Sequence, residues 1–227
     1  MLESEGVAMT DDKITTATFN SPRGIELISQ WVDLYRQGYL QRESIINPGT
    51  KIIEAYQSGQ VAMVFTGPVF LGRVKMNAPS IFAATGVAEN PVGCTGKQEL
   101  ATMVISVLAS TKYPKESADF TQFVLNAENQ LAFSKIEPTS PSVTSALKDA
   151  YFTKEDGTLQ SSARIIGARE LPASAQLSIY KQHPEYVHLK EIFDEAIQKA
   201  CLGNATTKEA LDDAARQWNE ILQKGAR

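Results

Sequence analysis

The sequence predicts an α/β fold that is rich in helix, and three observations lead to this prediction. Short apolar runs of the length of buried strands alternate with segments whose apolar residues recur at every third or fourth position. The C-terminal region carries two such helical stripes in succession, on either side of Gly203. Of the 227 residues, 43% are hydrophobic and 21% are charged, which supplies a substantial core and argues against disorder.

The first helix is predicted to begin at residue 22 and to end before Gly38. Ser21 is a suitable N-cap, Pro22 fits a first turn whose N–H groups have no intrahelical acceptor, and Gly38 can end a helix. The residues expected to form one buried face are Leu27, Ile28, Trp31, Leu34 and Tyr35.

Three apolar runs, residues 61–65, 81–91 and 102–108, are predicted to be strands. The first is apolar throughout, which is typical of a strand buried on both faces. Thr66-Gly67-Pro68 ends it, and a strand-to-helix turn is expected there, with Thr66 as the cap of the following helix.

Further helices are predicted after Pro114 and around residues 128–133, and a proline-rich break follows at residues 137–142. The two C-terminal stripes predict a pair of packed antiparallel helices. Thr206 and Glu209 have the spacing of a capping box at the start of the second one. The residues expected to be buried are Leu189, Ile192, Phe193, Ala196, Ile197, Ala200 and Cys201 in the first, and Ala210, Leu211, Ala214, Ala215, Trp218, Ile221 and Leu222 in the second.

Charge and motif content exclude several function classes. The net charge of −4 is spread along the chain, so nucleic acid is not expected as a partner. His183 and His188 have no nearby ligand cluster, and Cys94 and Cys201 fit neither a metal spacing nor a disulfide framework, so neither a metal nor a cofactor is predicted. No nucleophile elbow, phosphate-binding glycine loop or Cys–His pair is present, and we expect a protein that is not an enzyme.

The chain resembles, over nearly its whole length, the family 1 extracellular solute-binding proteins, the maltose-binding-protein-like group. The segments that carry the resemblance occur in the family's order: Asn20-Ser21-Pro22-Arg23-Gly24 with residues 31–35, residues 56–63 with Thr66-Gly67-Pro68, residues 110–120 with 127–130, Pro138-Thr139 with Ser145-Ala146-Leu147, and residues 203–218. The resemblance begins in the middle of a family member, so the expectation is an incomplete fold that lacks a signal peptide and much of the first lobe.

The resemblance implies a periplasmic-binding-protein type II-like fold and a role in solute import. The chain would be the C-terminal part of a two-lobed protein: residues 1–110 in the C-terminal lobe, ending in a hinge strand, residues 111–180 in the N-terminal lobe, and residues 181–227 as helices that return to the C-terminal lobe. The implied partners are a sugar or oligosaccharide and the membrane permease subunits of an ABC importer. The full-length protein would be periplasmic or lipid-anchored at the cell surface. The alternative is a truncated structural or interaction fragment without ligand binding. The free chain is expected in either case to expose apolar surface or to self-associate, because the missing half would leave strand edges and helix faces uncovered.

The resemblance also implies site residues, each with a simpler alternative. Thr66, Gly67 and Phe70 would line the ligand site where a strand meets a helix, or would form an ordinary capped turn. Tyr186 would stack on a sugar ring, or would be a core aromatic under the last helices. Glu170, beside Arg169, would reach the cleft, or would belong to a solvated surface pair.

Overall fold

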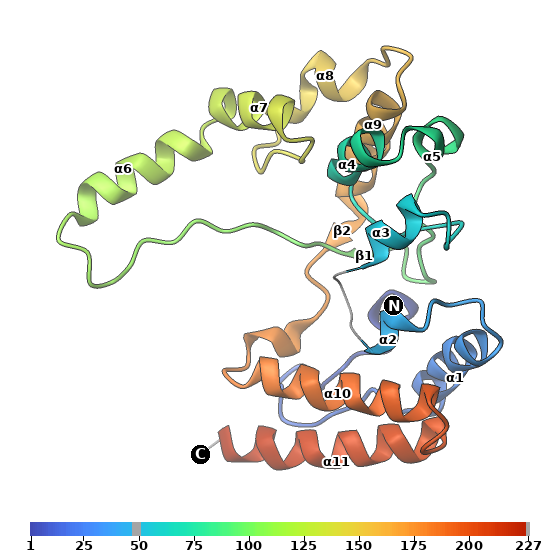
Figure 1. Cartoon of the computed structure of the whole chain (residues 1–227). Coiled ribbons are helices and arrows are strands. Elements are labelled where there is room, and N and C mark those ends of the chain that lie inside the picture. The colour runs from blue at the N-terminus through green and yellow to red at the C-terminus, as the bar shows by residue number, and fades with distance from the viewer. Residues whose placement is uncertain (47–50, 226–227) are drawn as a thin grey trace. The chain divides into compact units, whose positions relative to one another are not determined.

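The chain, represented by a computed structural model that describes residues 1–46 and 51–225, forms two compact units (Figure 1). Unit 1 consists of Met1–Ile52, Val92–Leu100 and Ala173–Arg227, and unit 2 of Ile53–Pro91 and Ala101–Pro172. The sequence predicts crossings between lobes near residues 101–111 and 170–186, and two of the unit boundaries fall at residues 100/101 and 172/173. The assignment of segments to lobes stays a prediction.

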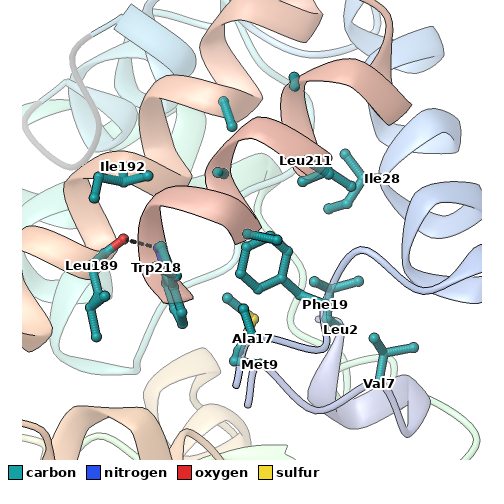
Figure 2. Packing of buried hydrophobic residues seen from close by; sticks show 14 of the residues in the cluster. Leu2, Val7, Met9, Ala17, Phe19, Ile28, Leu189, Ile192, Leu211 and Trp218 are labelled. Atoms are coloured by element: carbon teal, nitrogen blue, oxygen red, sulfur yellow. Dashed lines mark hydrogen bonds between the residues drawn. The ribbon is translucent and has the colours of Figure 1, made fainter. Parts of the chain in front are cut away.

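Three helices build the core of unit 1. They are α1 (Pro22–Arg36), α10 (Tyr186–Cys201) and α11 (Thr207–Gly225), and α10 and α11 lie side by side (Figures 1 and 2). Trp218 of α11 is completely buried, and its indole Nε1–H donates to the carbonyl oxygen of Leu189 at 2.7 Å. The ring of Phe19 packs edge-on against Trp218, with 4.9 Å between ring centroids. An apolar core with one satisfied polar group therefore fixes α10 against α11.

The helix ends follow the capping rules on which the sequence analysis relied. The Ser21 hydroxyl accepts the N–H of Gly24 at 3.2 Å, and α1 is followed by Gly38 with a φ of +80°. Thr206 and Glu209 form the predicted capping box, in which the Glu209 carboxylate accepts the N–H of Thr206 and the Thr206 hydroxyl accepts the N–H of Glu209. These predictions are confirmed.

The buried faces of the two C-terminal helices are confirmed, whereas the predicted face of α1 is partly wrong. In α10 and α11 the predicted residues are buried, except Phe193, Ile197 and Ile221, which are partly buried. In α1, Trp31 and Leu34 are exposed, and Val32 is buried instead. The core-facing stripe of α1 passes through Gly24, Ile28 and Val32, at a spacing of four residues, and Trp31 and Leu34 lie beside it.

The regular β-structure in the described residues is one parallel pair of two-residue strands. Strand β1 (Gln98–Glu99) pairs with β2 (Ser174–Ala175), and the N–H of Leu100 extends the ladder to the Ala175 carbonyl at 2.9 Å. Both strands belong to unit 1 and lie next to the boundaries at which the chain passes to unit 2 and returns. Unit 1 also contains three short helical turns, namely η1 (Glu3–Glu5), α2 (Glu43–Ile46) and η4 (Ile179–Gln182).

Unit 2 is made of short helices joined by loops. Its elements are α3 (Ile52–Gln57, which starts at the unit boundary), α4 (Val69–Asn77), α5 (Pro79–Ala84), α6 (Pro114–Leu125), α7 (Ala127–Ile136), η2 (Ala146–Lys148), α8 (Ala150–Thr153), α9 (Leu159–Glu170) and η3 (Leu171–Ala173, which ends just beyond the boundary). The helices predicted after Pro114 and around residues 128–133 are confirmed as α6 and α7. Asn126 caps α7 and Thr158 caps α9.

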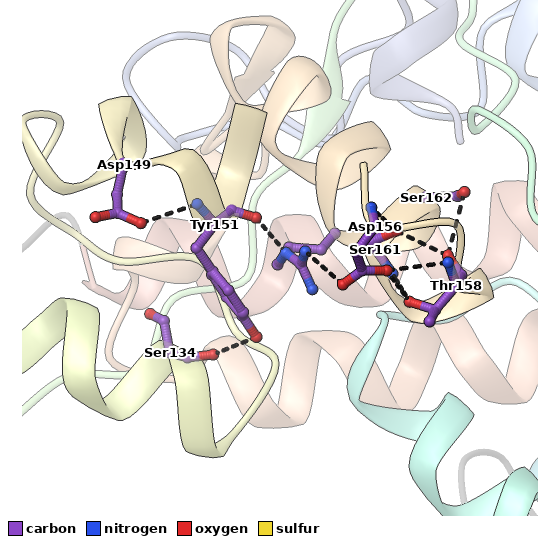
Figure 3. A network of polar contacts seen from close by, with 8 residues as sticks. Ser134, Asp149, Tyr151, Asp156, Thr158, Ser161 and Ser162 are labelled. Carbon is purple, nitrogen blue, oxygen red and sulfur yellow. Dashed lines mark hydrogen bonds and ion pairs between the residues drawn. The ribbon is translucent and has the colours of Figure 1, made fainter. Parts of the chain in front are cut away.

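A polar network joins α7, α8 and α9 (Figure 3). The Arg164 guanidinium lies 3.8 Å from the centroid of the Tyr151 ring and donates to the Tyr151 carbonyl oxygen. It also pairs with Asp156 at 3.9 Å, and the Tyr151 hydroxyl donates to the Ser134 carbonyl at 3.1 Å. Side-chain hydrogen bonds and a cation–π contact thus order a stretch that has little apolar periodicity.

The three predicted strands are wrong. Residues 61–65 have no strand structure, and Met63 and Phe65 are 87% and 69% exposed. Residues 79–84 form α5, because Pro79 is suited to a helical first turn. Residues 102–108 are also without regular structure, and Met103, Val104 and Leu108 are exposed. A strand needs a neighbour for its backbone groups, and neither 61–65 nor 102–108 has one among the described residues.

The two helical glycines Gly24 and Gly167 provide a matched test of this packing. A Cβ at Gly24 would lie 2.0 Å from the Phe19 carbonyl oxygen, whereas a Cβ at Gly167 would lie at an ordinary contact distance of 3.8 Å from Pro68. We therefore expect Gly24→Ala to lower the free energy of unfolding of unit 1 by about 2 kcal/mol or more. Gly167→Ala should raise that of unit 2 by about 0.5–1 kcal/mol, because alanine is the better helix former. Urea unfolding of both variants measures the difference, and equal effects would contradict the packing described.

Candidate functional site

The five predicted site residues are divided between the two units. Thr66, Gly67, Phe70 and Glu170 belong to unit 2, and Tyr186 belongs to unit 1.

The turn before α4 exposes Thr66 and Gly67. No side chain caps α4, so the prediction of a Thr66 cap is wrong, and the residue that directly precedes the helix is Pro68. The Gly67 carbonyl instead accepts the N–H of Phe70 at 3.2 Å, which closes the turn through the backbone. The Thr66 hydroxyl is therefore not used to begin the helix.

Two further contacts hold this turn and the start of α4. Pro68 lies over α9 at Gly167, the contact already noted. Phe70 is half-buried, and the guanidinium of Arg73, one turn further along α4, lies 5.8 Å from the centroid of its ring. One face of Phe70 is thus occupied by a cation from its own helix.

Glu170 ends α9 and holds a neighbouring loop. Its carboxylate accepts the backbone N–H of Asn90 at 2.5 Å and the Asn90 side-chain amide at 3.0 Å. This two-point interaction with Asn90 replaces the solvated pair with Arg169 that the alternative expected. Arg169 itself is exposed.

Tyr186 is the first residue of α10 and is 43% exposed. Its backbone N–H donates to the His183 carbonyl at 3.0 Å. The alternative of a core aromatic does not hold for Tyr186, because the tyrosine that packs against Trp218 is Tyr180, with 5.1 Å between ring centroids. Part of the Tyr186 side chain therefore remains accessible to other molecules.

Sequence reasoning missed a polar cluster in unit 1 that joins η1, β1 and η4. The Glu99 carboxylate accepts the N–H of Leu177 at 2.9 Å and forms an ion pair with Lys181 at 2.8 Å. The Ser178 hydroxyl lies 2.6 Å from the carboxylate of Glu3 and 3.3 Å from that of Glu99. No local signal could have revealed this cluster, because its members lie far apart in the sequence and each is an ordinary polar residue.

The two carboxyl groups of this cluster have opposite pKa shifts. Burial raises the pKa of Glu3 above its usual value, and the nearby Glu99 adds to the rise, although the Ser178 hydroxyl opposes it. Burial also acts to raise the pKa of Glu99, but the Lys181 hydrogen bond and the Leu177 N–H outweigh it and leave that pKa lowered. Burial raises the pKa of Tyr180 to about 12.

The described residues offer no sign of metal chemistry. Among them, no three side chains of His, Cys, Asp or Glu gather as a metal site would require. Cys94 is exposed, and Cys201 is buried as predicted, where burial raises the pKa of its thiol. In residues 1–46 and 51–225, no helix has the length and hydrophobicity needed to cross a bilayer.

Two hollows on unit 1 contain none of the five predicted residues. One lies along Asn20 and α11, where Asp212, Arg216 and Asn219 line it. The other lies between α1 and the turn that starts α11, where Arg36 and Thr206 line it. Both are open to solvent on a single unit.

Solved structures share this fold. A protein of Synechococcus sp. MITs9220, provisionally named an oligosaccharide periplasmic-binding protein and solved with zinc, is 29% identical, with a TM-score of 0.90. This match covers 99% of the present chain and 58% of that one. A solute-binding protein of Thermotoga lettingae bound with α-D-tagatose matches with a TM-score of 0.73 at 19% identity, over 97% of this chain and 54% of that one, and it supports the fold alone. The predicted periplasmic-binding-protein fold is confirmed over the part that the chain covers.

Curated relatives agree with this result. Provisionally named binding proteins of Brucella abortus strain 2308 and Brucella suis biovar 1 are each 22% identical over 215 residues. Each match covers 94% of the present chain and 50% of the relative. The chain thus spans about half the length of the curated relatives it matches.

The sequence profile of the bacterial extracellular solute-binding proteins matches residues 1–159. This match includes more than half of the chain, in agreement with the structural likeness. The chain therefore belongs to the bacterial extracellular solute-binding proteins.

Proposed function

We propose that the protein containing this chain is the solute-binding component of an ABC importer and that its solute is an uncharged mono- or oligosaccharide. The observation that carries the proposal is the match to the Synechococcus protein over 99% of the chain at a TM-score of 0.90, because that protein is named for oligosaccharides. The Thermotoga protein binds tagatose, and the GacH receptor of Streptomyces glaucescens binds acarbose. The protein would bind its solute without transforming it.

The proposed site includes Thr66, Gly67, Phe70, Glu170 and Tyr186. Sugars present C–H faces to aromatic rings and hydroxyl groups to polar side chains and backbone amides. Tyr186 supplies an accessible ring, and the Thr66-Gly67 turn supplies an exposed hydroxyl and backbone. An anionic solute would favour a convergent cluster of Arg and Lys. The cations beside these five residues are separate: Arg169 is exposed next to Glu170, and Arg73 lies over the ring of Phe70.

The lobe assignment and the cellular location belong to the same proposal. Residues 1–110 and 181–227 would contribute to the C-terminal lobe and residues 111–180 to the N-terminal lobe. The complete protein would work outside the cytoplasm, in the periplasm or anchored by a lipid at the cell surface, and would deliver its solute to the permease subunits.

The first test concerns Tyr186. In the complete protein, Tyr186→Ala should weaken sugar binding by about 1–3 kcal/mol, the scale for loss of one aromatic contact at a binding site. Isothermal titration calorimetry measures the change, and Tyr39→Ala, an exposed tyrosine of unit 1 outside the site, is the matched control. Unchanged affinity in Tyr186→Ala rules out stacking, and tight binding of a phosphate ester or an amino acid in place of sugars overturns the substrate class.

A second test separates Glu170 from its neighbour Arg169. Glu170 holds Asn90 through two hydrogen bonds, so its removal should disturb the loop as well as any direct ligand contact. We expect Glu170→Ala to lower sugar affinity about tenfold, the scale of hydrogen bonds to a charged group. Arg169→Ala should change it less than about twofold, since Arg169 is exposed. Equal affinities in the two variants would exclude Glu170 from the site.

A second candidate function, that of an interaction fragment, is favoured by the apolar surface of unit 2. Residues 61–65 and 102–108 and the helix α6 expose Met63, Phe65, Met103, Val104, Leu108, Phe120 and Phe123. Exposed apolar segments that lack strand partners are prone to pair with another chain. In this reading the 227-residue chain binds a second copy of itself and no solute.

We expect the 227-residue chain alone to self-associate and to bind a hydrophobic dye. Phe65→Asp should reduce both, because it places a charge within the exposed segment, and Tyr39→Asp, at an exposed site of unit 1, should reduce neither. Sedimentation velocity and dye fluorescence measure the two effects. A clean monomer without dye binding would contradict this expectation.

A further inference from the structure

The unit 1 cluster of Glu3, Ser178 and Glu99 brings together three parts of the chain at the β1–β2 pair. Glu3 lies on η1, Glu99 is the last residue of β1, and Ser178 follows β2 and precedes η4. Ser178 is buried. The cluster therefore lies next to both points, 100/101 and 172/173, at which the backbone passes between the units.

The Ser178 hydroxyl lies within hydrogen-bond distance of two carboxylates but has only one hydrogen to donate. Ser178 Oγ lies 2.6 Å from Glu3 Oε2 and 3.3 Å from Glu99 Oε2, and a serine hydroxyl carries one hydrogen. If both carboxylates are ionised, Ser178 can donate to only one of them. If Glu3 keeps a proton, Glu3 donates to Ser178 Oγ and Ser178 donates to Glu99, so each contact contains a hydrogen.

Glu99 does not need that proton, because other donors satisfy it. Lys181 Nζ lies 2.8 Å from Glu99 Oε1, and the N–H groups of Leu177 and Ser178 donate to Glu99 Oε2 at 2.9 and 3.3 Å. Within residues 1–46 and 51–225, the Glu3 carboxylate has a single hydrogen-bond partner, Ser178. The proton therefore belongs on Glu3.

We propose that Glu3, Ser178 and Glu99 form a proton-dependent latch that fastens the η1 turn to the strand pair at which the chain passes between the units. With Glu3 protonated, the chain Glu3–Ser178–Glu99 is complete and the segment 174–178 is held. Loss of the proton removes one hydrogen bond and places two negative charges on either side of a single hydroxyl. This inference concerns unit 1 itself and does not depend on the proposed solute.

The surrounding charges support this direction of the effect. The Met1 amino group and Lys181 lower the pKa of Glu3, but burial and Glu99 outweigh them and its pKa is raised. Tyr180 and Asp194 complete the charged environment, and Tyr180 stays protonated because its pKa is about 12. On the same turn, Glu5 pairs with Arg23 at 3.3 Å instead of with Ser178.

The sign of the pH dependence follows from these directions. Because the pKa of folded Glu3 is raised, its stabilising contribution is complete below the usual value of 4.5 and is lost as the pH rises through the folded pKa. The pKa of Glu99 is lowered, so its contribution is lost only as the pH falls below 4.5. The latch thus opens at pH values above 4.5. The titration of Glu99 lies below pH 4.5 and is therefore separate from this opening.

Hydrogen exchange in the 227-residue chain tests the latch. Glu3→Gln replaces the protonated carboxyl by an amide donor that cannot titrate. When the unmodified chain and Glu3→Gln are compared at the same pH, the effect of pH on the intrinsic exchange rate is the same for both. At pH 8 we expect the amides of Leu177 and Ser178 to exchange about threefold to tenfold faster in the unmodified chain than in Glu3→Gln, the range for one net hydrogen bond. At pH 4 the two chains should agree within about twofold. Glu5→Gln, on the same turn, should behave like the unmodified chain at both pH values.

An NMR titration of the unmodified chain is a second test, which does not require a variant to fold. In the unmodified chain, NMR titration of the Glu3 side chain should give a pKa above 4.5, and the amide shifts of Leu177 and Ser178 should follow the same curve. Equal exchange in the unmodified chain and Glu3→Gln at pH 8 would overturn the latch. A Glu3 pKa at or below 4.5 would overturn it as well.

Discussion

The buried indole of Trp218 has one polar atom, Nε1, and the packing of unit 1 depends on the hydrogen bond that this atom donates. The Nε1–H group donates to the carbonyl of Leu189 in the first turn of α10, which sets the register of α11 against α10. An unpaired buried donor would cost about 1–3 kcal/mol, so the two helices cannot slide past each other without that penalty. Tyr186 lies three residues before Leu189, so the accessible tyrosine is close in sequence to this buried contact.

In unit 2 a polar network adds to the apolar contacts. The helices of this unit are short, and the Arg164 network with Tyr151 and Asp156 joins them through polar contacts. Unit 2 also buries apolar side chains, among them Phe152 and Ile165. Directional hydrogen bonds therefore help to set how α7, α8 and α9 meet, in addition to that burial.

The sequence alone was sufficient for the helix caps and for the two C-terminal stripes. Ser21, Gly38 and the Thr206–Glu209 box act within one turn of their helices, and the stripes of α10 and α11 report directly on burial, so these predictions are confirmed. Residues 61–65 failed because an apolar run becomes a strand only when another segment pairs with it, and no local pattern shows whether a neighbour is present.

The site could be predicted only in part for the same reason. The resemblance suggested five positions, which stay a prediction, and the exposure of Tyr186 and of the Thr66-Gly67 turn is compatible with a ligand. The contact of Glu170 with Asn90 joins residues 80 positions apart, and that of Ser178 with Glu3 joins residues 175 positions apart. Contacts at such separations leave no periodicity in a single sequence.

The division of unit 1 among three separate stretches of the chain has a consequence for biosynthesis. Phe19 and α1 are synthesised before unit 2, whereas Trp218, against which Phe19 packs, is synthesised after it. Unit 2 lies entirely within residues 53–172, so it can assemble while the early segments of unit 1 still lack their partners. Until Trp218 is made, those segments expose Phe19, Leu27 and Ile28, so apolar surface of unit 1 stays uncovered while unit 2 can already fold.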